Sequence, residues 1–160
     1  MASEIVPGLW IGNKGDSMDR EFLTKKKVST VFNCTKNLPF EPSIIRQLRV
    51  PLDDNLQPEE IRNMELWSME IAYKISVELG RARKNGEAVL VHCHAGMQRS
   101  AGSVALYLIA AHGMTTDEAV AFIRKRRSIA FTPAINFEKA IRGFEATFER
   151  EVRPAIGTTR

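Results

Sequence analysis

The segment Val91–Ser100 constrains the fold most, because it joins two apolar runs through a very short loop. The run before it, Glu87–Val91, is rich in aliphatic and β-branched residues and predicts a buried strand. The run after it, Ser103–Ala111, is apolar and unbroken and predicts a helix. A strand, a tight loop and a helix aim successive backbone N–H groups and the positive end of the helix dipole at one point, so the segment predicts an anion-binding site.

Cys93 and Arg99 are the residues of this loop that predict a reaction. A thiol has an ordinary pKa of ~8.5, and a helix N-terminus or a nearby cation lowers it to ~3.5–7.5, so we expect Cys93 to be a thiolate nucleophile. The planar guanidinium of Arg99 matches two oxygens of a phosphate, where a lysine supplies only a point charge. Gly96 suits a loop that needs a positive φ and a close approach of the backbone to an oxyanion.

Neighbouring residues are expected to assist this pair. Ser100 could donate a hydrogen bond to the sulfur and help the thiolate leave when a phosphocysteine intermediate is hydrolysed. The ring of His92 could bond the loop backbone and hold the cysteine in place. The phosphate itself is expected to bind backbone N–H groups and the arginine side chain. These substrate-binding residues are His94, Ala95, Gly96, Met97, Gln98 and Arg99.

The segment His92–Ser100 resembles the signature His-Cys-x5-Arg-Ser/Thr of the cysteine-dependent protein tyrosine phosphatase superfamily, with every fixed position filled. Flanking segments resemble the dual-specificity phosphatases of that superfamily, and the likeness extends from Ile5 to Phe148. These segments are Ile5–Asn13, Val31–Pro39, Val50–Asn55, Gly113–Ala119, Phe122–Arg127 and Asn136–Phe137. The resemblance implies a protein phosphatase that needs no metal or cofactor and acts on phosphotyrosine and on phosphoserine or phosphothreonine.

The resemblance also implies one α/β domain with a central, mostly parallel, twisted sheet flanked by helices. We expect the catalytic domain over residues 1–150 and a C-terminal tail over 151–160, frayed from Arg153 onward. Apolar patterning and turn signals predict the individual elements. The predicted strands are Ile5–Val6, Leu9–Gly12, Val28–Cys34, Leu48–Leu52 and Ala88–His92, and the predicted helices are Asp16–Lys26, Pro58–Lys84, Ser100–His112, Thr116–Arg126 and Asn136–Glu149.

The general acid is expected in Val50–Asn55. Expelling an alkoxide is costly, so a carboxylic acid that protonates the leaving oxygen raises the rate ~10²–10⁴-fold. The resemblance places this acid immediately before the asparagine, at Asp54. Asp53 is the rival, because neighbouring residues of an extended chain point in opposite directions.

The chain departs from the family pattern at two places. Gln98 stands where many dual-specificity enzymes carry serine, and Ser128–Pro133 looks longer than the corresponding segment of the family. Both departures are expected to reshape the rim of the pocket. A lipid phosphatase of the superfamily would be expected to carry lysines inside the loop, and this loop has none.

The second cysteine and the histidines have alternative interpretations. Cys34 ends a strand expected near the nucleophile strand, so it could trap oxidised Cys93 in a disulfide, although a buried structural cysteine is the default. The neighbours His92, Cys93 and His94 look like metal ligands, but adjacent residues of a strand face opposite sides and no second ligand cluster exists in the sequence. We expect no metal site.

Composition predicts a small enzyme rather than a membrane protein. The chain has 160 residues, of which 44% are apolar and 26% charged, and no apolar run reaches the ~18 residues of a membrane span. Two cysteines make no disulfide framework, and a catalytic thiol needs a reducing compartment. We expect a protein of the cytoplasm, and also of the nucleus, that acts as a monomer or homodimer away from membranes.

The formal net charge of +4 suits phosphorylated protein substrates. Arg124–Arg127 is the densest cationic cluster, and it could steer acidic partners or contact nucleic acid. It also ends a predicted helix, where cations interact favourably with the dipole, and this structural interpretation is favoured. Nucleic acid is therefore not the expected partner. Two alternative functions remain for the same scaffold: an RNA 5′-triphosphatase, and a catalytically silent module that binds phosphoproteins.

Overall fold

The structure is a computed structural model, and it describes residues 1–156. Five strands form one sheet in the order β1-β2-β5-β3-β4, with β1 and β2 antiparallel and the other neighbours parallel, as the sequence predicts for a mostly parallel sheet. The strands are β1 (Ser3–Val6), β2 (Leu9–Gly12), β3 (Val28–Asn33), β4 (Arg46–Arg49) and β5 (Ala88–His92). Because β5 lies in the centre of the sheet and all its residues are buried, the loop that follows it begins from a rigid base.

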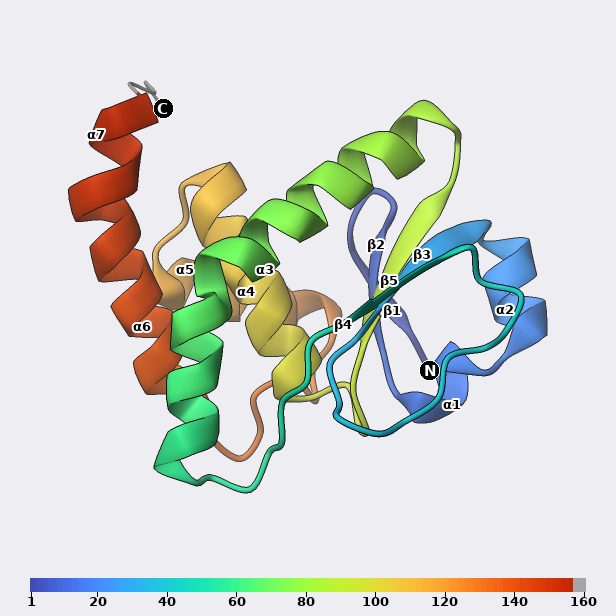
Figure 1. The fold of residues 1–160 in the computed structure, drawn as a ribbon, viewed down its shortest axis with the longest axis horizontal. Coiled ribbons are helices and arrows are strands. Elements are labelled where there is room, and N and C mark those ends of the chain that lie inside the picture. Colours follow the sequence, from blue (N-terminus) through green and yellow to red (C-terminus); the bar gives the residue numbers. More distant parts are fainter. Residues whose placement is uncertain (157–160) are drawn as a thin grey trace.

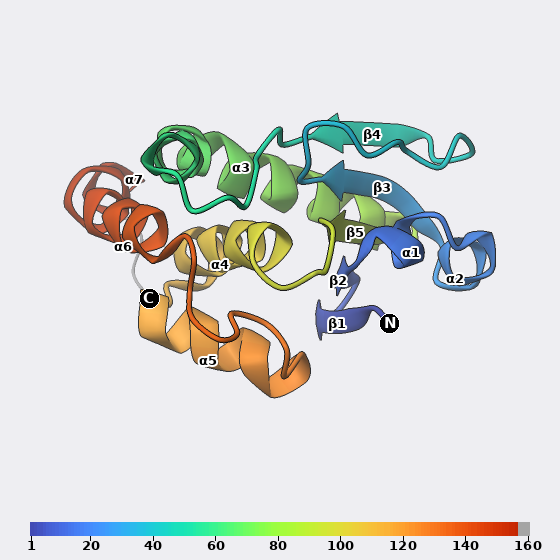
Figure 2. The same cartoon turned by 90° about the horizontal axis from the view of Figure 1, so that it is seen from below.

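Helices cover both faces of the sheet (Figures 1 and 2). One face packs against α3, α4 and α5, with α6 lying outside α3 and α4, while α1 and α2 lie on the other face. The helices are α1 (Lys14–Ser17), α2 (Arg20–Lys25), α3 (Pro58–Lys84), α4 (Arg99–His112), α5 (Thr116–Arg126), α6 (Glu138–Thr147) and α7 (Arg153–Ile156), with a π-helical segment η1 (Phe148–Val152) between the last two.

Strand alternation divides the core into two clusters. In β5, Val89 and Val91 belong to the large cluster beneath α3 and α4, whereas Ala88 and Leu90 belong to a smaller cluster beneath α2. This alternation is the expected period of two for a strand with both faces covered. The first residues of α4, from Ser100 to Ile109, are all buried, so the helix that follows the nucleophile loop is held on every side.

Two predicted elements differ from the structure. The predicted helix Asp16–Lys26 is split into α1 and α2, because the Asp19 side chain accepts a hydrogen bond from the Phe22 N–H and starts a new helix. The predicted strand Leu48–Leu52 instead lies at Arg46–Arg49. Its pairing with β3 ends where the Val50 N–H donates to the Asn33 carbonyl, since Pro51 has no N–H to continue the ladder.

The end of the described chain also differs from the prediction. The last predicted helix began at Asn136, but α6 begins at Glu138. The chain then stays helical through η1 and α7 to Ile156, and Val152 packs against the core, where fraying was expected from Arg153. Residues 157–160 of the predicted tail lie outside the described residues. None of the helices within residues 1–156 has both the length and the apolar character needed to span a membrane.

Candidate active site

The loop of residues 93–98, called the cradle loop here, connects β5 to α4. Its carbonyl groups are bound from outside: the His94 carbonyl accepts from the Lys14 N–H at 3.0 Å, and the Met97 carbonyl accepts from the Phe131 N–H at 2.8 Å. Gly96 has φ +68°, and a Cβ at this position would lie 2.6 Å from the Gly12 carbonyl oxygen. Only glycine fits this turn without moving the neighbouring strand.

The Cys93 thiol lies at the base of the cradle loop and is 2% exposed. Its Sγ is 3.2 Å from the Ser100 hydroxyl. Burial raises the pKa of this thiol, but hydrogen bonds from the Ser100 hydroxyl and from the backbone N–H groups of Ser100 and Gly96, together with the Arg99 charge, outweigh burial and lower the pKa. The structure therefore brings Cys93, Ser100 and Arg99 together in an arrangement that favours the anionic form of the sulfur.

Arg99 joins the cradle loop to the segment expected to hold the acid. One terminal nitrogen, Nη1, donates to the Leu52 carbonyl at 3.1 Å. The Nε atom is buried and has no hydrogen-bond partner among the described residues. A buried, unpaired N–H is costly, so this donor beside Cys93 is suited to an oxygen of a bound anion.

Residues 52–55, called the acid loop here, carry both candidate acids. The Asp54 Oδ1 atom accepts from the Asn136 side-chain Nδ2 at 2.9 Å, and the residue is partly buried. Asp53 is exposed, and its backbone N–H donates to the Glu60 Oε1 at 3.0 Å. The two carboxyl groups thus lie in different surroundings, and Asp54 is the one held by a neighbouring segment.

Glu60 and Asn136 are site residues that the sequence analysis did not identify. Glu60, in the first turn of α3, is 5% exposed and forms an ion pair of 2.5 Å with the half-exposed Lys36. Burial raises the pKa of Glu60, but the hydrogen bonds from Lys36 and from the Asp53 N–H outweigh it and lower the pKa. An acidic residue in a first helical turn was the only signal for Glu60, and the dipole alone explains such a residue.

The ring of His92 contacts the backbone of the nucleophile Cys93. Its ring Nδ1 lies 3.2 Å from the Cys93 carbonyl oxygen, and the residue is fully buried. Burial lowers the pKa of the imidazole to about 4, so the ring is neutral at physiological pH. A neutral ring with its proton on Nδ1 donates to that carbonyl, which is the backbone bond expected from the sequence.

Arg127 is a further residue whose role the sequence analysis missed. It is 4% exposed, and its Nε donates to the Gly96 carbonyl at 2.7 Å, behind the cradle loop. Its Nη1 also donates to the Met1 carbonyl at 2.6 Å. In the same cluster, Arg124 donates to the carbonyls of Ala130 and Phe131. At these two arginines the cationic cluster is structural, but through hydrogen bonds to backbone carbonyls outside α5, where the favoured interpretation expected an interaction with the helix dipole.

Cys34 is fully buried, and its Sγ lies 3.6 Å from the Ser103 hydroxyl. Burial, followed by the nearby Cys93 thiolate, raises the pKa of Cys34 to about 12, so its thiol is protonated. Both cysteines are free in the structure. Within residues 1–156, no group of three or more His, Cys, Asp and Glu side chains is placed to hold a metal ion.

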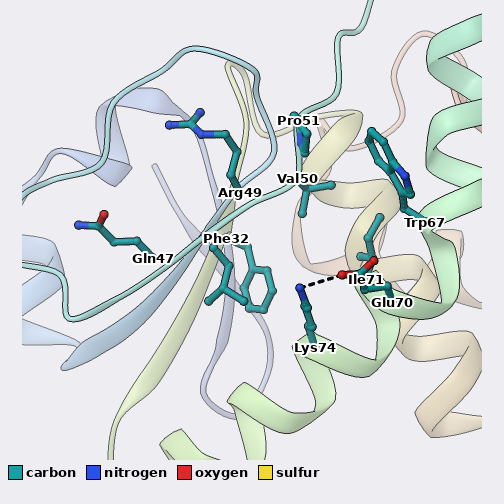
Figure 3. Close-up of a pocket in the computed structure, with 10 residues that line it drawn as sticks. Phe32, Gln47, Arg49, Val50, Pro51, Trp67, Glu70, Ile71 and Lys74 are labelled. Atoms are coloured by element: carbon teal, nitrogen blue, oxygen red, sulfur yellow. Dashed lines mark ion pairs between the residues drawn. The ribbon is translucent and has the colours of Figure 1, made fainter.

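A cavity of about 420 Å³ lies apart from this site, between β4 and α3 (Figure 3). Phe32, Trp67 and Ile71 form its apolar wall, and Glu70 and Lys74 form an ion pair of 2.8 Å at its edge. No residue of the cradle loop lines it. The cavity and the candidate active site are therefore separate features.

The sequence of the chain is similar to known phosphatases. Residues 9–147 match the family described as dual specificity phosphatase, catalytic domain. The chain is 31% identical over 144 residues to the protein phosphatase Slingshot homolog of Xenopus laevis, covering 89% of this chain and 20% of that protein. It is 29% identical over 144 residues to human dual specificity protein phosphatase 22, covering 89% of this chain and 73% of that protein.

Solved structures show the same fold. The crystal structure of DUSP15 aligns with a TM-score of 0.80 and 24% identity, covering 98% of this chain and 94% of that one. Human DUSP28 aligns with a TM-score of 0.75 and 21% identity, covering 92% and 95% of the two chains. Several of the matched curated relatives are much longer proteins, and this chain spans only about a fifth of the Slingshot homolog and of human dual specificity protein phosphatase 8.

Proposed function

The chain belongs to the dual specificity phosphatase family, and we propose that it is a protein phosphatase that hydrolyses phosphotyrosine and phosphoserine or phosphothreonine through a phosphocysteine intermediate. The observation that carries the proposal is the Cys93 thiol, buried and lowered in pKa, 3.2 Å from the Ser100 hydroxyl. A thiolate in this loop, beside the unpaired Nε of Arg99 at the start of α4, is suited to attack a phosphate monoester.

In the first step, the Cys93 sulfur attacks phosphorus and the bond from phosphorus to the substrate oxygen breaks. Backbone N–H groups of residues 94–99 and the Arg99 guanidinium stabilise the charge on the three equatorial oxygens. The Asp54 carboxylic acid donates its proton to the leaving oxygen, so that a neutral hydroxyl departs. The products of this step are the free hydroxyl side chain of the substrate and a phosphocysteine.

In the second step, the Asp54 carboxylate removes a proton from a water molecule, which attacks the phosphorus. The bond between phosphorus and sulfur breaks, inorganic phosphate forms, and the sulfur leaves as a thiolate. The Ser100 hydroxyl, 3.2 Å from the sulfur, stabilises this leaving group. The carboxyl group is returned to its acid form, and the enzyme needs no cofactor for the cycle.

The remaining expectations about the protein extend this proposal. Its partners are phosphorylated proteins, and it acts in the cytoplasm and nucleus as a monomer or homodimer. Cys34 remains a candidate redox partner of Cys93, and the protonated Cys34 thiol beside Ser103 supports the structural role instead. Oxidation with hydrogen peroxide followed by peptide mapping would distinguish a disulfide between these cysteines from oxidation of Cys93 alone.

Substrate trapping tests the proposed function directly. Cys93→Ser should abolish turnover and still retain phosphopeptides, because the cradle loop keeps its N–H groups. The unmodified chain should then be assayed with three substrates: phosphotyrosine peptides, phosphothreonine peptides and triphosphorylated RNA. Release of phosphate from both peptide classes supports the proposal. Faster γ-phosphate release from RNA would favour the RNA 5′-triphosphatase, and binding without turnover would favour the silent module.

A further inference from the structure

Gln98 uses its side chain to bind a distant segment of the chain. The residue is 5% exposed, and its Nε2 donates to the Thr132 carbonyl at 3.3 Å and to the Ala134 carbonyl at 2.8 Å. Its Oε1 accepts from the Asn136 backbone N–H at 3.0 Å. One carboxamide therefore holds three backbone groups of residues 132–136, and it fills three of the four hydrogen bonds that it can make.

The Gln98 side chain does not take part in starting α4, the helix that follows it. Gln98 is the N-cap residue of α4, but its side chain makes no capping bond. Its backbone carbonyl begins the helix by accepting from the Gly102 N–H at 2.7 Å. The carboxamide is thus committed to residues 132–136 instead of to α4.

One of the three bonds, to the Thr132 carbonyl, connects the two places where the sequence departs from the family pattern, and the other two lie just beyond the second of them. Gln98 replaces the serine found in many dual-specificity enzymes, and Ser128–Pro133 is the segment that looks longer than usual. A serine hydroxyl is two bonds shorter than a glutamine carboxamide and could not span the same distance.

The segment held by Gln98 in turn holds the acid. The Asn136 backbone N–H donates to the Gln98 Oε1, and the Asn136 side-chain Nδ2 donates to the Asp54 Oδ1 at 2.9 Å. Hydrogen bonds thus run from the cradle loop through Asn136 to the Asp54 carboxyl group. The next residue, Arg99, holds the other flank of the acid loop through the Leu52 carbonyl at 3.1 Å.

We propose that Gln98 is a positioning residue, which sets the place of the Asp54 carboxyl group relative to the Cys93 sulfur by fixing Asn136. The inference rests on the proposed function, because only there does Asp54 transfer a proton. Without Gln98, Asp54 keeps two other anchors of its loop, the Leu52 carbonyl on Arg99 and the Asp53 N–H on Glu60. Loss of Gln98 therefore loosens the acid and does not remove it.

The leaving group of the substrate tests this role. Phenyl phosphate needs protonation of its leaving oxygen, whereas 4-nitrophenyl phosphate releases a weaker base that needs it much less. The readout is the ratio of kcat/KM for 4-nitrophenyl phosphate to kcat/KM for phenyl phosphate, because kcat/KM reports the steps up to the phosphocysteine and excludes its hydrolysis, which is common to both substrates. Gln98→Met keeps the length of the side chain without its hydrogen bonds, and it should raise this ratio roughly fivefold, the effect of about one hydrogen bond. General damage to the cradle loop would slow both substrates and leave the ratio unchanged.

Two more variants identify the route of the effect. Asn136→Ala, which keeps the backbone N–H bound by Gln98 but removes the bond to Asp54, should raise the ratio by a similar factor. The double variant should match either single variant, because both act on one carboxyl group. In an Asp54→Ala background, Gln98→Met should raise the ratio no further. Gln47→Met, at an exposed glutamine of β4, is the control for loss of a carboxamide elsewhere.

The outcomes separate the inference from the function on which it rests. A ratio that does not move in Gln98→Met or Asn136→Ala, although the unmodified chain hydrolyses both substrates, overturns the inference alone. So does a further rise in the Asp54→Ala background. If the unmodified chain hydrolyses neither aryl phosphate, the proposed function is overturned, and the inference with it. If Gln98→Met fails to fold by circular dichroism, Asn136→Ala gives the same test.

Discussion

The cradle loop and the acid loop meet at one site but are held in different ways. The groups around the Cys93 sulfur come from one short segment between a fully buried strand and a buried helix, and Cys93 and the Ser100 hydroxyl that it contacts are only seven residues apart in sequence. The acid loop has no regular structure, and its anchors come from Arg99, Asn136 and Glu60, up to 82 residues away. The groups that contact the sulfur are thus local in sequence, whereas the acid is held by groups from distant segments, and tertiary bonds from Lys14, Phe131 and Arg127 only support the backbone of the cradle loop.

Removing the acid should give the largest effect and separate the two loops. Asp54→Ala should lower kcat for a phosphotyrosine peptide by about 10²–10⁴-fold, because the leaving oxygen loses its proton donor. The value of kcat/KM for 4-nitrophenyl phosphate, which reports only the steps up to the phosphocysteine, should fall much less, because this leaving group hardly needs a proton. Asp53→Ala is the matched control, since only the backbone N–H of Asp53 bonds Glu60. If Asp53→Ala proved the more damaging change, the assignment of the acid to Asp54 would be wrong.

Distorting the cradle loop should slow all substrates alike. In Gly96→Ala, the new Cβ would lie 2.6 Å from the Gly12 carbonyl oxygen, at a φ of +68°. We expect a loss of roughly 10² in kcat/KM for aryl phosphates and peptides, as when an oxyanion donor is misplaced. The free energy of unfolding should fall by about 1–3 kcal/mol.

Gly80→Ala is the control for this variant. A Cβ at Gly80, on α3, would meet nothing within 4 Å. Helix propensity should therefore raise the stability by about 1 kcal/mol, with activity unaltered. An active, stable Gly96→Ala enzyme would show that the backbone of the cradle loop is less constrained than the geometry indicates.

The smallest effect is expected where an anchor of the acid loop is weakened rather than lost. Glu60→Gln keeps an acceptor for the Asp53 N–H but removes the ion pair with Lys36, which is half exposed. We expect a loss of less than about tenfold in kcat for a phosphotyrosine peptide and of about 1 kcal/mol in stability, as for a pair in which one partner is open to solvent. If the unmodified chain and Glu60→Gln had equal free energies of unfolding at neutral pH, the ion pair of Glu60 and Lys36 would contribute nothing to stability.

The pH dependence of stability gives the sign of the Glu60 effect. The pKa of Glu60 is lower in the folded protein than its ordinary value. Its stabilising contribution is therefore present at neutral pH and is lost as the pH falls through the folded pKa. Denaturant unfolding of both proteins should show the advantage of the unmodified chain at neutral pH and its disappearance in acid.

The same difference between the loops explains how much the sequence could predict. The strand, the loop, the helix, and the contact of Ser100 with the Cys93 sulfur all follow from one short segment. Arg127 and Glu60 were not identified, because their bonds to the Gly96 carbonyl and the Asp53 N–H exist only after the chain has folded. A buried arginine that binds a backbone carbonyl and a surface arginine that ends a helix look the same in a sequence.

Strand β4 and the N-terminal helices show the same limit for the fold. The apolar residues of Leu48–Leu52 correctly predicted a strand in this region, but the strand lies at Arg46–Arg49, because Pro51 ends the ladder. The split between α1 and α2 depends on one side-chain cap at Asp19. Short-range chemistry decides such boundaries, and apolar periodicity alone does not record it.

Alkylation of Cys93 by iodoacetamide, followed by peptide mapping across a range of pH, tests the central claim most directly. The protonated and fully buried Cys34 serves as the internal reference. We predict that the alkylation rate rises with a midpoint below the ordinary thiol pKa of ~8.5, that Ser100→Ala moves this midpoint upward, and that inorganic phosphate protects the thiol. A midpoint at or above the ordinary value, with no protection by phosphate, would contradict a thiolate held in an anion-binding loop.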